Sequence, residues 1–317
     1  TGVTAISGSI SDINDVLAAE TSQGNAGQQI DLDTDFTVTV TDTGSIAATT
    51  LTTLDSGVPG TVTVTNTVTL TGTAAEIAAA ATADANGTLL LAESTFGATV
   101  DAGSVAATDL TTIVGQTSAT INATAATAIT GTASAVVAAI NHAQVNHDSD
   151  FTVTLTADST ATASDLKTIN TATSGIITAT GVTAISGSIS DINDVLAVET
   201  SQGNAGQQID LDTDFTVTVT DTGSVAATTL TTLDSGVPGT VTATTVDTVT
   251  GTAAEIAAAA TADANGTLVL KADFAATVSA GSAAASDLKT INAVTSGIIT
   301  ATGVTAITGS ISDQVHH

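Results

Sequence analysis

The sequence repeats itself at two scales, and this repetition limits the fold more than any other feature. The stretch TGVTAISGSISDINDVLA begins at Thr1 and returns at Thr180, which gives a long period of 179 residues. A shorter period of 56 to 64 residues separates the glycines that stand before helix-like segments, which are Gly8, Gly72, Gly131, Gly187, Gly251 and Gly309. The five phenylalanines keep a similar spacing, at Phe36, Phe96, Phe151, Phe215 and Phe274. Periods of this size predict a stacked array in which each unit buries its apolar side chains against its neighbours.

No boundary divides this array into ordinary domains, and none is needed, because each unit contacts only the next. We therefore expect one array over residues 1–317, with approximate repeats 1–60, 61–119, 120–176, 177–239 and 240–298 and a partial repeat 299–313. The chain begins with Thr1 and contains no methionine, from which we expect a segment excised from a larger protein. His316 and His317 resemble the start of a purification tag.

Each repeat reads as two similar halves, in which an alternating strand is followed by a short helix. In segments such as DFTVTVTD, valine alternates with threonine, and a period of two predicts a half-buried strand. The first-half helices carry the S/T-x-x-D/E capping pattern in Ser9 with Asp12, Thr73 with Glu76, Ser188 with Asp191 and Thr252 with Glu255, whereas Thr132 is followed by Ala135. The second-half helices are expected to begin near Ser45, Ser104, Thr160, Ser224 and Ser282.

Strands that alternate with helices, over connections too long for hairpins, predict parallel strands joined by right-handed crossovers. The predicted fold is an α/β solenoid with about two coils per repeat, and a rod on the order of 50 Å long at ~4.8 Å per strand. The alternative is a parallel β-helix with helical corners. Asn86-Gly87 and Asn265-Gly266 have the sequence of tight hairpin turns, so each is a candidate local hairpin outside the main sheet.

Composition and charge exclude several classes of partner. The chain has three lysines, no arginine and a formal net charge of −28. Without a cationic patch, binding to nucleic acid or to an anionic membrane surface is not expected. No apolar run reaches the ~18 residues of a membrane-spanning helix, so membrane insertion is not expected either. Because cysteine is absent, disulfides and thiolate metal sites are excluded.

The repeat pattern resembles a known kind of protein. VTAISGSISDINDVLA, VTLTGTAAEIAAAA, VTVTDTGSVAATTL and SDLKTINTATSG look like the Thr/Ala/Asp-rich tandem repeats of very large bacterial, notably cyanobacterial, surface proteins. The resemblance covers the chain from Thr1 to about Asp313. Such proteins are similar to type I-secreted adhesins and S-layer proteins, so the resemblance implies an extracellular or cell-surface location, a structural or adhesive role and often calcium dependence. The glycine-aspartate nonapeptides of the RTX type are not present in the sequence.

Calcium is the candidate cofactor, and it is argued from the carboxylates themselves. Two D-x-D-x-D segments place acids at every second residue, namely Asp31, Asp33, Asp35 and Asp210, Asp212, Asp214. In an extended chain these acids share one face, and hard oxygen ligands suit calcium. The competing interpretation is a solvated acidic face that keeps the protein soluble, because the loop glycine of an EF-hand is missing from the motif.

Three further hypotheses concern local features. His142 and His147, with Asp148 and Asp150, form a histidine-bearing loop that is either a simple insertion or a transition-metal site. Threonines in segments 37–41, 61–71 and 216–220 would form ladders on a flat sheet, as in solenoid ice-binding or crystal-binding proteins, or reflect ordinary strand amphipathicity. A carbohydrate-active solenoid enzyme is the third, but the acids recur in copies, and catalysis requires one tuned site.

From these observations we expect no enzyme but a structural repeat segment, either a stiff spacer or a lattice element, of a large extracellular bacterial surface protein or adhesin. Its expected partners are other copies of the chain, associated end to end or laterally, and neighbouring repeats of the parent chain. An exposed unit at each end of an array has strand edges and apolar side chains without a neighbour, which favours contacts between copies.

Overall fold

The computed structural model describes residues 2–20, 30–92, 95–156, 159–199 and 208–310. The chain forms two compact units, one of residues 1–154 with 172–175 and one of residues 155–171 with 176–317. Each unit is described by itself. Residues 311–317, which hold the end of the expected partial repeat and the expected tag remnant, lie outside the described residues.

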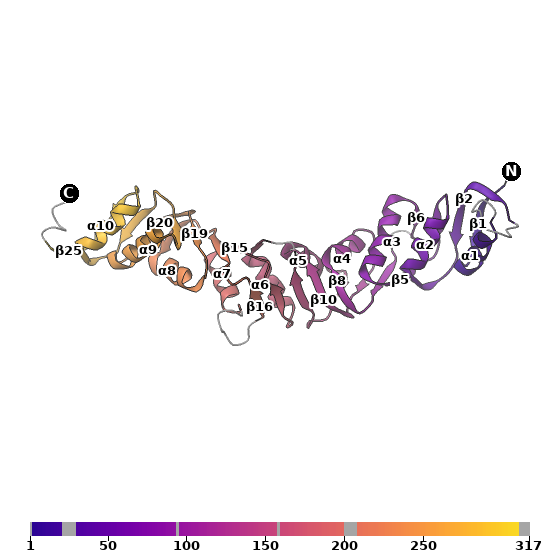
Figure 1. Ribbon diagram of the computed structural model, residues 1–317, viewed down its shortest axis with the longest axis horizontal. Helices are drawn as coiled ribbons and strands as arrows, with labels where there is room; N and C mark the ends of the chain where they lie inside the picture. Colours follow the sequence, from indigo (N-terminus) through magenta and orange to yellow (C-terminus); the bar gives the residue numbers. More distant parts are fainter. Residues whose placement is uncertain (1, 21–29, 93–94, 157–158, 200–207, 311–317) are drawn as a thin grey trace. The chain divides into compact units, whose positions relative to one another are not determined.

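The first unit is built from short strands and helices that alternate along the chain (Figure 1). Its helices are α1 (Ile10–Ala18), α2 (Ala48–Gly57), α3 (Ala74–Asn86), α4 (Ala107–Val114) and α5 (Ala133–Ile140). Its strands are β1 (Val3–Gly8), β2 (Leu32–Val40), β3 (Gly44–Ala47), β4 (Val62–Val64), β5 (Val68–Gly72), β6 (Leu89–Leu90), β7 (Gly97–Val100), β8 (Gly103–Ala106), β9 (Ile121–Asn122), β10 (Ala126–Gly131), β11 (Val145–Asn146) and β12 (Thr152–Leu155).

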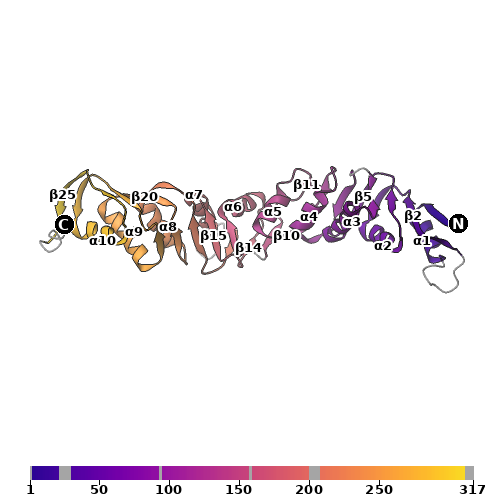
Figure 2. The same cartoon turned by 90° about the horizontal axis from the view of Figure 1, so that it is seen from above.

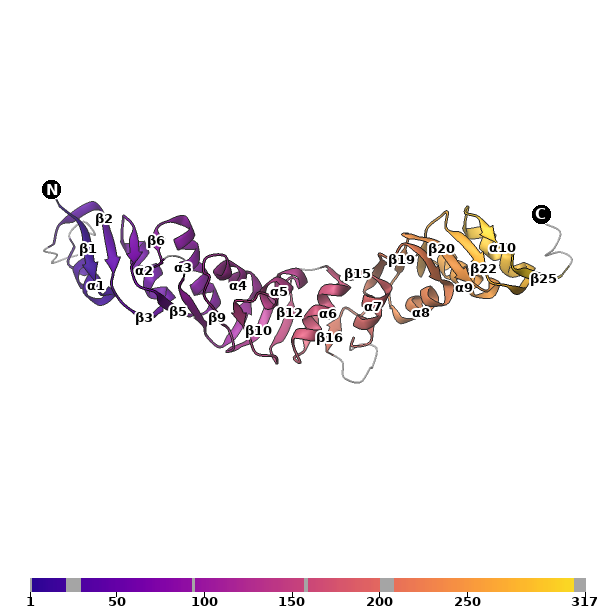
Figure 3. The ribbon, with the colours of Figure 1, turned by 180° about the vertical axis from the view of Figure 1, so that it is seen from behind.

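The second unit repeats this organisation (Figure 3). Its helices are α6 (Ala163–Ala172), α7 (Ile189–Leu196), α8 (Ala227–Gly236), α9 (Ala253–Asn265) and α10 (Ala285–Val294). Its strands are β13 (Thr160–Thr162), β14 (Ile177–Ala179), β15 (Ala184–Gly187), β16 (Ile209–Leu211), β17 (Thr216–Val219), β18 (Gly223–Ala226), β19 (Val241–Ala243), β20 (Val246–Gly251), β21 (Leu268–Leu270), β22 (Ala275–Val278), β23 (Gly281–Ala284), β24 (Ile299–Thr300) and β25 (Val304–Thr308).

Every strand pair whose register is described is parallel, as the sequence predicted. Val38 of β2 lies opposite Val62 of β4, and Val62 lies opposite Leu89 of β6. In the second unit, Ile185 of β15 lies opposite Val217 of β17, and Val217 lies opposite Val241 of β19. In each pair, one strand therefore follows the other in the sequence by roughly half of a 60-residue repeat. The architecture is an α/β repeat of parallel sheets and short helices.

The sheets are staggered along the chain, which the sequence analysis did not predict. The strands with the pattern Gly-Ser-x-Ala each begin a new sheet, as β3 does in the order β3-β5-β7-β9-β11 and β18 does in the order β18-β20-β22-β24. In the first unit, the sheet β1-β2-β4-β6 therefore overlaps the sheet that starts at β3. From β2 onward in this unit, consecutive strands belong to different, overlapping sheets.

The positions of the second-half helices were predicted three residues too early. Ser45, Ser104, Ser224 and Ser282 lie in strands β3, β8, β18 and β23, and Thr160 lies in β13. At the four serines the physical reason is the preceding glycine, which has a positive φ, for example 83° at Gly44 and 79° at Gly223, whereas Ser159 precedes Thr160. Glycine adopts this conformation without a steric penalty, so the chain turns there and continues as a strand before the helix begins.

The core consists of buried apolar residues that recur in each repeat. All five phenylalanines are buried, and so are the helix residues Leu51, Leu54, Leu110, Ile113, Leu166, Ile169 and Ile291, whereas Leu288 is half-buried. Helices α2, α3 and α4 contact one another in sequence, as do α8, α9 and α10 (Figures 1 and 2). The regular spacing of the phenylalanines further predicts that all five form one internal row, and this stays a prediction.

A row of hydrogen bonds to the phenylalanine carbonyl oxygens, here called the phenylalanine seam, fixes the backbone at each phenylalanine. The carbonyl oxygen of Phe215 accepts a hydrogen bond from Gly239 N at 3.1 Å, and that of Phe96 accepts one from the buried Thr117 hydroxyl at 2.6 Å. These partners come from the segment that follows the next helix. Glycine recurs beside the phenylalanine carbonyl because an added Cβ would meet backbone oxygen there, at Gly60, Gly175, Gly239 and Gly297.

The predicted helix caps are confirmed. The hydroxyls of Ser9 and Ser188 accept from the amides of Asp12 and Asp191. Thr73 with Glu76 and Thr252 with Glu255 form complete capping boxes. In the third repeat, Thr132 accepts from Ala135 N without a carboxylate to complete the box.

The predicted hairpins at the two Asn-Gly pairs are wrong. Gly87 and Gly266 are instead the C-caps of α3 and α9, both in the left-handed conformation at φ 78°. Asn-Gly supplies the positive φ that both a tight hairpin turn and a helix C-cap require, so the dipeptide alone does not separate them. The alanine-rich helix before each pair decides for the cap.

An N-cap substitution tests the helix boundaries. The exposed N-cap Ala226 of α8 makes no side-chain cap, whereas Thr162 before α6 accepts from Asp165 N at 3.1 Å. We expect Ala226→Thr to raise the free energy of unfolding by about 1 kcal/mol and Thr162→Ala to lower it by a similar amount. Urea denaturation measures both, and a loss of stability in Ala226→Thr would contradict the assigned start of α8.

Candidate functional site

The two acidic segments lie at equivalent places but differ in local structure. In the first, β2 pairs with β1 as Val3 to Leu32 and then as Ala5 to Thr37, so β2 carries extra residues between these pairs. Asp33 falls within this irregular part, and Asp31 and Asp35 are exposed. The regular alternation that would place three acids on one strand face is therefore interrupted.

In the second segment, the chain turns after Leu211. Asp210 lies in β16, opposite Thr178, whereas Asp212 and Asp214 lie beyond the end of that strand. The Asp212 carboxylate accepts from Asp214 N at 3.3 Å. The two carboxyl groups also lie close to each other, and this contact lowers the pKa of Asp212 and raises the pKa of Asp214. The turn thus brings together two of the three predicted calcium ligands.

Within the described ranges, the structure brings no three acidic or histidine side chains into one metal-sized group. Asp31, Asp33 and Asp35, like Asp210, Asp212 and Asp214, stay candidate calcium ligands. Carboxylate oxygen is the donor that calcium prefers, but a calcium site needs six to eight such ligands, so each segment would need further oxygens.

Sequence reasoning missed two buried glutamates beside these segments. Glu20 and Glu199 are fully buried and lie one long period apart. Glu20 accepts a hydrogen bond from Leu32 N at 3.3 Å, and Glu199 accepts one from Leu211 N at 3.4 Å. Both carboxylates therefore fix the backbone next to the aspartates. The sequence signal was an acid eleven residues after the helix N-cap, which recurs as Asp84 and Asp263 in other repeats.

Calcium binding is tested by thermal unfolding. If the acidic segments bind calcium, the ion should raise the melting temperature and a chelator should lower it, because a ligand at 100 times its Kd stabilises the folded state by about 2.7 kcal/mol. The double variant Asp212→Asn with Asp214→Asn should lose most of this response. Asp273→Asn, which removes another exposed aspartate before a phenylalanine, is the matched control. Equal melting curves in chelator and in millimolar calcium, at matched ionic strength, would contradict calcium binding and favour the competing interpretation of a solvated acidic face.

The histidine loop has a packing role. His147 meets the ring of Phe151 edge to face, with centroids 5.0 Å apart. Its ring nitrogens face two backbone carbonyl oxygens, of Asp148 at 2.7 Å and of Ile140 at 3.2 Å. His142 Nδ1 accepts from Gln144 N at 3.4 Å. His147 thus packs against Phe151, and His142 makes a contact within its own loop.

The threonine ladders are short. Thr39 lies between Ser7 and Thr63 on neighbouring strands, but the step after Thr63 leads to the exposed Leu90. In the second unit, Thr218 lies between Ser186 and Thr242, and Val269 follows. The first of these ladders spans three strands and the second spans four, because Thr162 lies opposite Ser186, and each ends at an apolar residue.

Lys167 and Lys271 form ion pairs with aspartates from neighbouring segments. Lys167 of α6 contacts Asp191 at 3.0 Å and Asp194 at 2.7 Å, both on α7. Lys271 contacts Asp247 at 2.9 Å. These hydrogen bonds lower the pKa of Asp191 and of Asp247.

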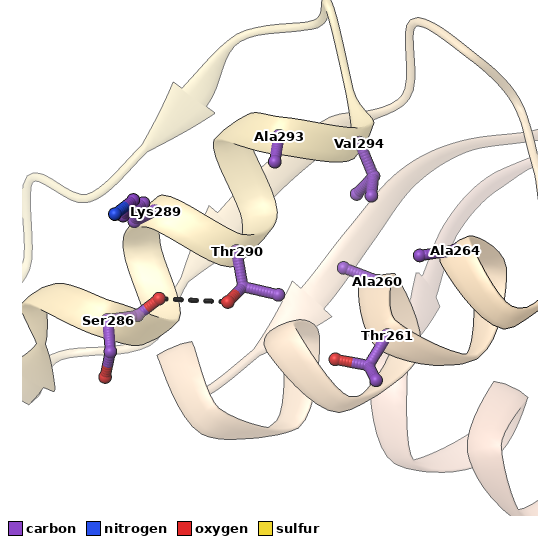
Figure 4. Close-up of a pocket in the computed structure, with 8 residues that line it drawn as sticks. All are labelled: Ala260, Thr261, Ala264, Ser286, Lys289, Thr290, Ala293 and Val294. Atoms are coloured by element: carbon purple, nitrogen blue, oxygen red, sulfur yellow. Dashed lines mark hydrogen bonds between the residues drawn. The ribbon is translucent and has the colours of Figure 1, made fainter.

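A shallow groove lies between α9 and α10 in the second unit (Figure 4). Ala260, Thr261 and Ala264 line it from α9, and Ser286, Lys289, Thr290, Ala293 and Val294 line it from α10. Thr290 donates a hydrogen bond to Ser286 O at 3.0 Å, so its hydroxyl is used within the helix.

The described helices include none with the length and apolar character to cross a membrane. Comparisons with protein-family models, with curated proteins and with solved structures gave no match.

Proposed function

We propose that this chain is a structural repeat segment, a stiff spacer or lattice element of a large extracellular bacterial surface protein. The observation that carries the proposal is the double connection between successive steps of each unit. From α2 to α3, for example, the pairs β2–β4 and β3–β5 both cross the step, and both are parallel. A structure in which every step is joined to the next by two backbone ladders is suited to transmitting position and force.

The finer fold that we propose is a right-handed α/β solenoid with about two coils per repeat. Parallel strands joined through a helix favour the right-handed crossover in ~98% of known cases. The registers support two coils per repeat, because Val38 pairs with Val62 and Val62 with Leu89. A parallel β-helix with helical corners is the alternative description of the same path.

The extracellular part of the proposal is supported by the resemblance and by composition. The net charge of −28 with three lysines suits a protein that stays soluble without binding nucleic acid, and the absence of cysteine means that folding needs no oxidant. Detection of the parent protein on intact cells, with an antibody raised against this chain, tests that location.

The expected dimensions test the spacer role. Paired strands are ~4.8 Å apart, but packed helices need 8–10 Å, so contacting neighbours such as α2, α3 and α4 should set the advance per coil. Helix α7 repeats α1 after six helix-to-helix steps. A chain lengthened by one 179-residue period should therefore gain about 50–60 Å in maximum dimension.

Small-angle X-ray scattering of the chain and of the lengthened chain measures this increase. A gain of about 50 Å or more supports the spacer. A gain of only a few ångströms, as expected when added mass packs into a globule, would overturn it. The same samples should show no thermal hysteresis, and measurable hysteresis would favour the ice-binding alternative over the spacer.

A further inference from the structure

Three segments of the chain share one sequence. Residues 1–12 read TGVTAISGSISD, residues 180–191 are identical, and residues 302–313 differ only by Thr308 in place of serine. The middle copy lies inside the second unit, whereas the other two lie at the ends of their sheets. The middle copy therefore shows which neighbours this segment takes on both sides.

The middle copy forms β15, which lies between β13 and β17 in the sheet β13-β15-β17-β19-β21. Ile185 is opposite Ala161 on one side and Val217 on the other. The strand is thus paired along both edges, and Ile185 is only 1% exposed.

The two outer copies are each paired on one edge. In the sheet β1-β2-β4-β6, β1 is the first strand, and Ile6 lies opposite Val38 just as Ile185 lies opposite Val217. At the other end, β25 pairs with β23, and Ile307 lies opposite Ala283 just as Ile185 lies opposite Ala161. Together, β23 and β2 are the two neighbours that the middle copy has.

Apolar side chains are exposed where β1 and β25 have no second neighbour among the described residues. Val3 is 49% exposed, whereas the equivalent Val182 is fully buried. Ile307 is 53% exposed. On the helices, Leu288 of α10 and Val16 of α1 are half-buried, although their equivalents Leu166 and Val195 are buried.

An ion pair is incomplete in the same way. Lys289 of α10 is the equivalent of Lys167 in the shared sequence SDLKTIN, and Asp12 and Asp15 of α1 are the equivalents of Asp191 and Asp194. Lys289 is exposed and makes no ion pair with the residues that the structure describes. It is one of the residues that line the groove between α9 and α10 (Figure 4). Asp313, a second equivalent of Asp191, lies outside the described residues, so the described equivalents of both aspartates are Asp12 and Asp15, near the other terminus of the sequence.

We propose that two copies of this chain associate head to tail by strand exchange, with β1 of one copy replacing β25 beside β23 of the other. The register would place Ala5 opposite Ser282 and Ile6 opposite Ala283, as Ala306 and Ile307 lie now. The joint sheet would run β23-β1-β2-β4-β6, which reproduces the order β13-β15-β17-β19-β21. Lys289 would contact Asp12 and Asp15 of the second copy.

The exchange makes association weak and concentration-dependent. The incoming strand β1 has nearly the sequence of β25, so one set of backbone hydrogen bonds replaces another. The net gain comes from the apolar side chains of α1 and α10 that become buried and from the new ion pairs. This inference extends the structural role to contacts between copies, and its failure would not affect the predicted gain in length of a single lengthened chain.

A charge exchange on the full chain tests the proposal. Lys289→Glu would face Asp12 and Asp15 of a second copy, and the double variant Asp12→Lys with Asp15→Lys would face Lys289. We expect each alone to associate about tenfold more weakly than the unchanged chain, as sedimentation over a concentration series measures, because attraction becomes repulsion. An equimolar mixture of the two should regain association. Lys271→Glu, which changes net charge equally but lies in another ion pair, is the control and should behave like the unchanged chain.

A disulfide test checks the register independently. The chain has no cysteine, so Ser282→Cys and Ala5→Cys in separate copies form one possible pair between molecules. Under mild oxidation this mixture should yield a covalent dimer, whereas Ser282→Cys mixed with Ile6→Cys should yield far less, because residue 6 would lie opposite Ala283 in the regular part of the pairing and point to the other face of the strand. Equal yields from both mixtures, a charge-variant mixture that stays as dissociated as its components, or an unchanged chain that stays monomeric at all concentrations would each overturn the proposal.

Discussion

Phe215→Ala is expected to lower the free energy of unfolding by about 3–5 kcal/mol, the usual cost of removing a fully buried aromatic side chain. Phe215 is fully buried, and its backbone carbonyl is bound by Gly239 from the next segment. The cavity would lie where the phenylalanine contacts the next strand-helix segment, so we expect the neighbouring helices to unfold together. Urea denaturation followed by circular dichroism measures the change.

Phe215→Leu is the control for this variant, because leucine keeps most of the buried apolar volume and should cost clearly less. The same comparison at Phe36, one long period earlier and equally buried, should give similar values. A cost below about 1 kcal/mol for Phe215→Ala would mean that the phenylalanines are not central to packing.

The second large effect on stability is expected at Gly239, which lies in the phenylalanine seam beside the Phe215 carbonyl. A Cβ added to Gly239 would lie 2.6 Å from Phe215 O and 2.8 Å from Asp214 O, and both are backbone atoms that cannot move alone. We expect Gly239→Ala to cost at least about 2–3 kcal/mol, the upper part of the range for overpacking. Thermal or urea unfolding provides the measurement.

Gly236→Ala is the matched control, three residues earlier. Its added Cβ would meet only Leu196 Cδ1 at 3.7 Å, which is ordinary contact, and it lies at the end of α8, where alanine favours the helix. We expect no loss of stability. Equal destabilisation by both substitutions would show that the cost comes from losing glycine itself and not from the phenylalanine carbonyl.

The sequence predicted the parts of the fold that depend on local patterns. The hydroxyl and carboxylate of Thr73 and Glu76 stand three residues apart, which is the spacing that a capping box requires, and the structure has it. The parallel pairing followed from strands separated by helices. Burial of the phenylalanines followed from their period.

The predictions that were wrong concern features set by contacts between residues far apart in the sequence. Ser45 looked like an N-cap because serine often occupies that position, but the strand partner Thr69 holds it in β3. The bulge opposite Val3 and the turn at Asp212 likewise arise from pairing and not from the acidic pattern. Glu20 was missed because its partner, Leu32 N, lies twelve residues away across the chain.

The staggered sheets have a mechanical consequence. In the first unit, one ladder stops at β6, but the one that began at β3 runs on to β11, and β8 has already started another. The ends of the sheets do not coincide, so wherever one ladder of strands ends, the neighbouring ladder continues and carries the tension along the stacking direction. In the described part of this unit from β2 onward, this tension would act along the hydrogen bonds and would have to break two rows of them at once, so rupture should be abrupt and not a gradual unzipping.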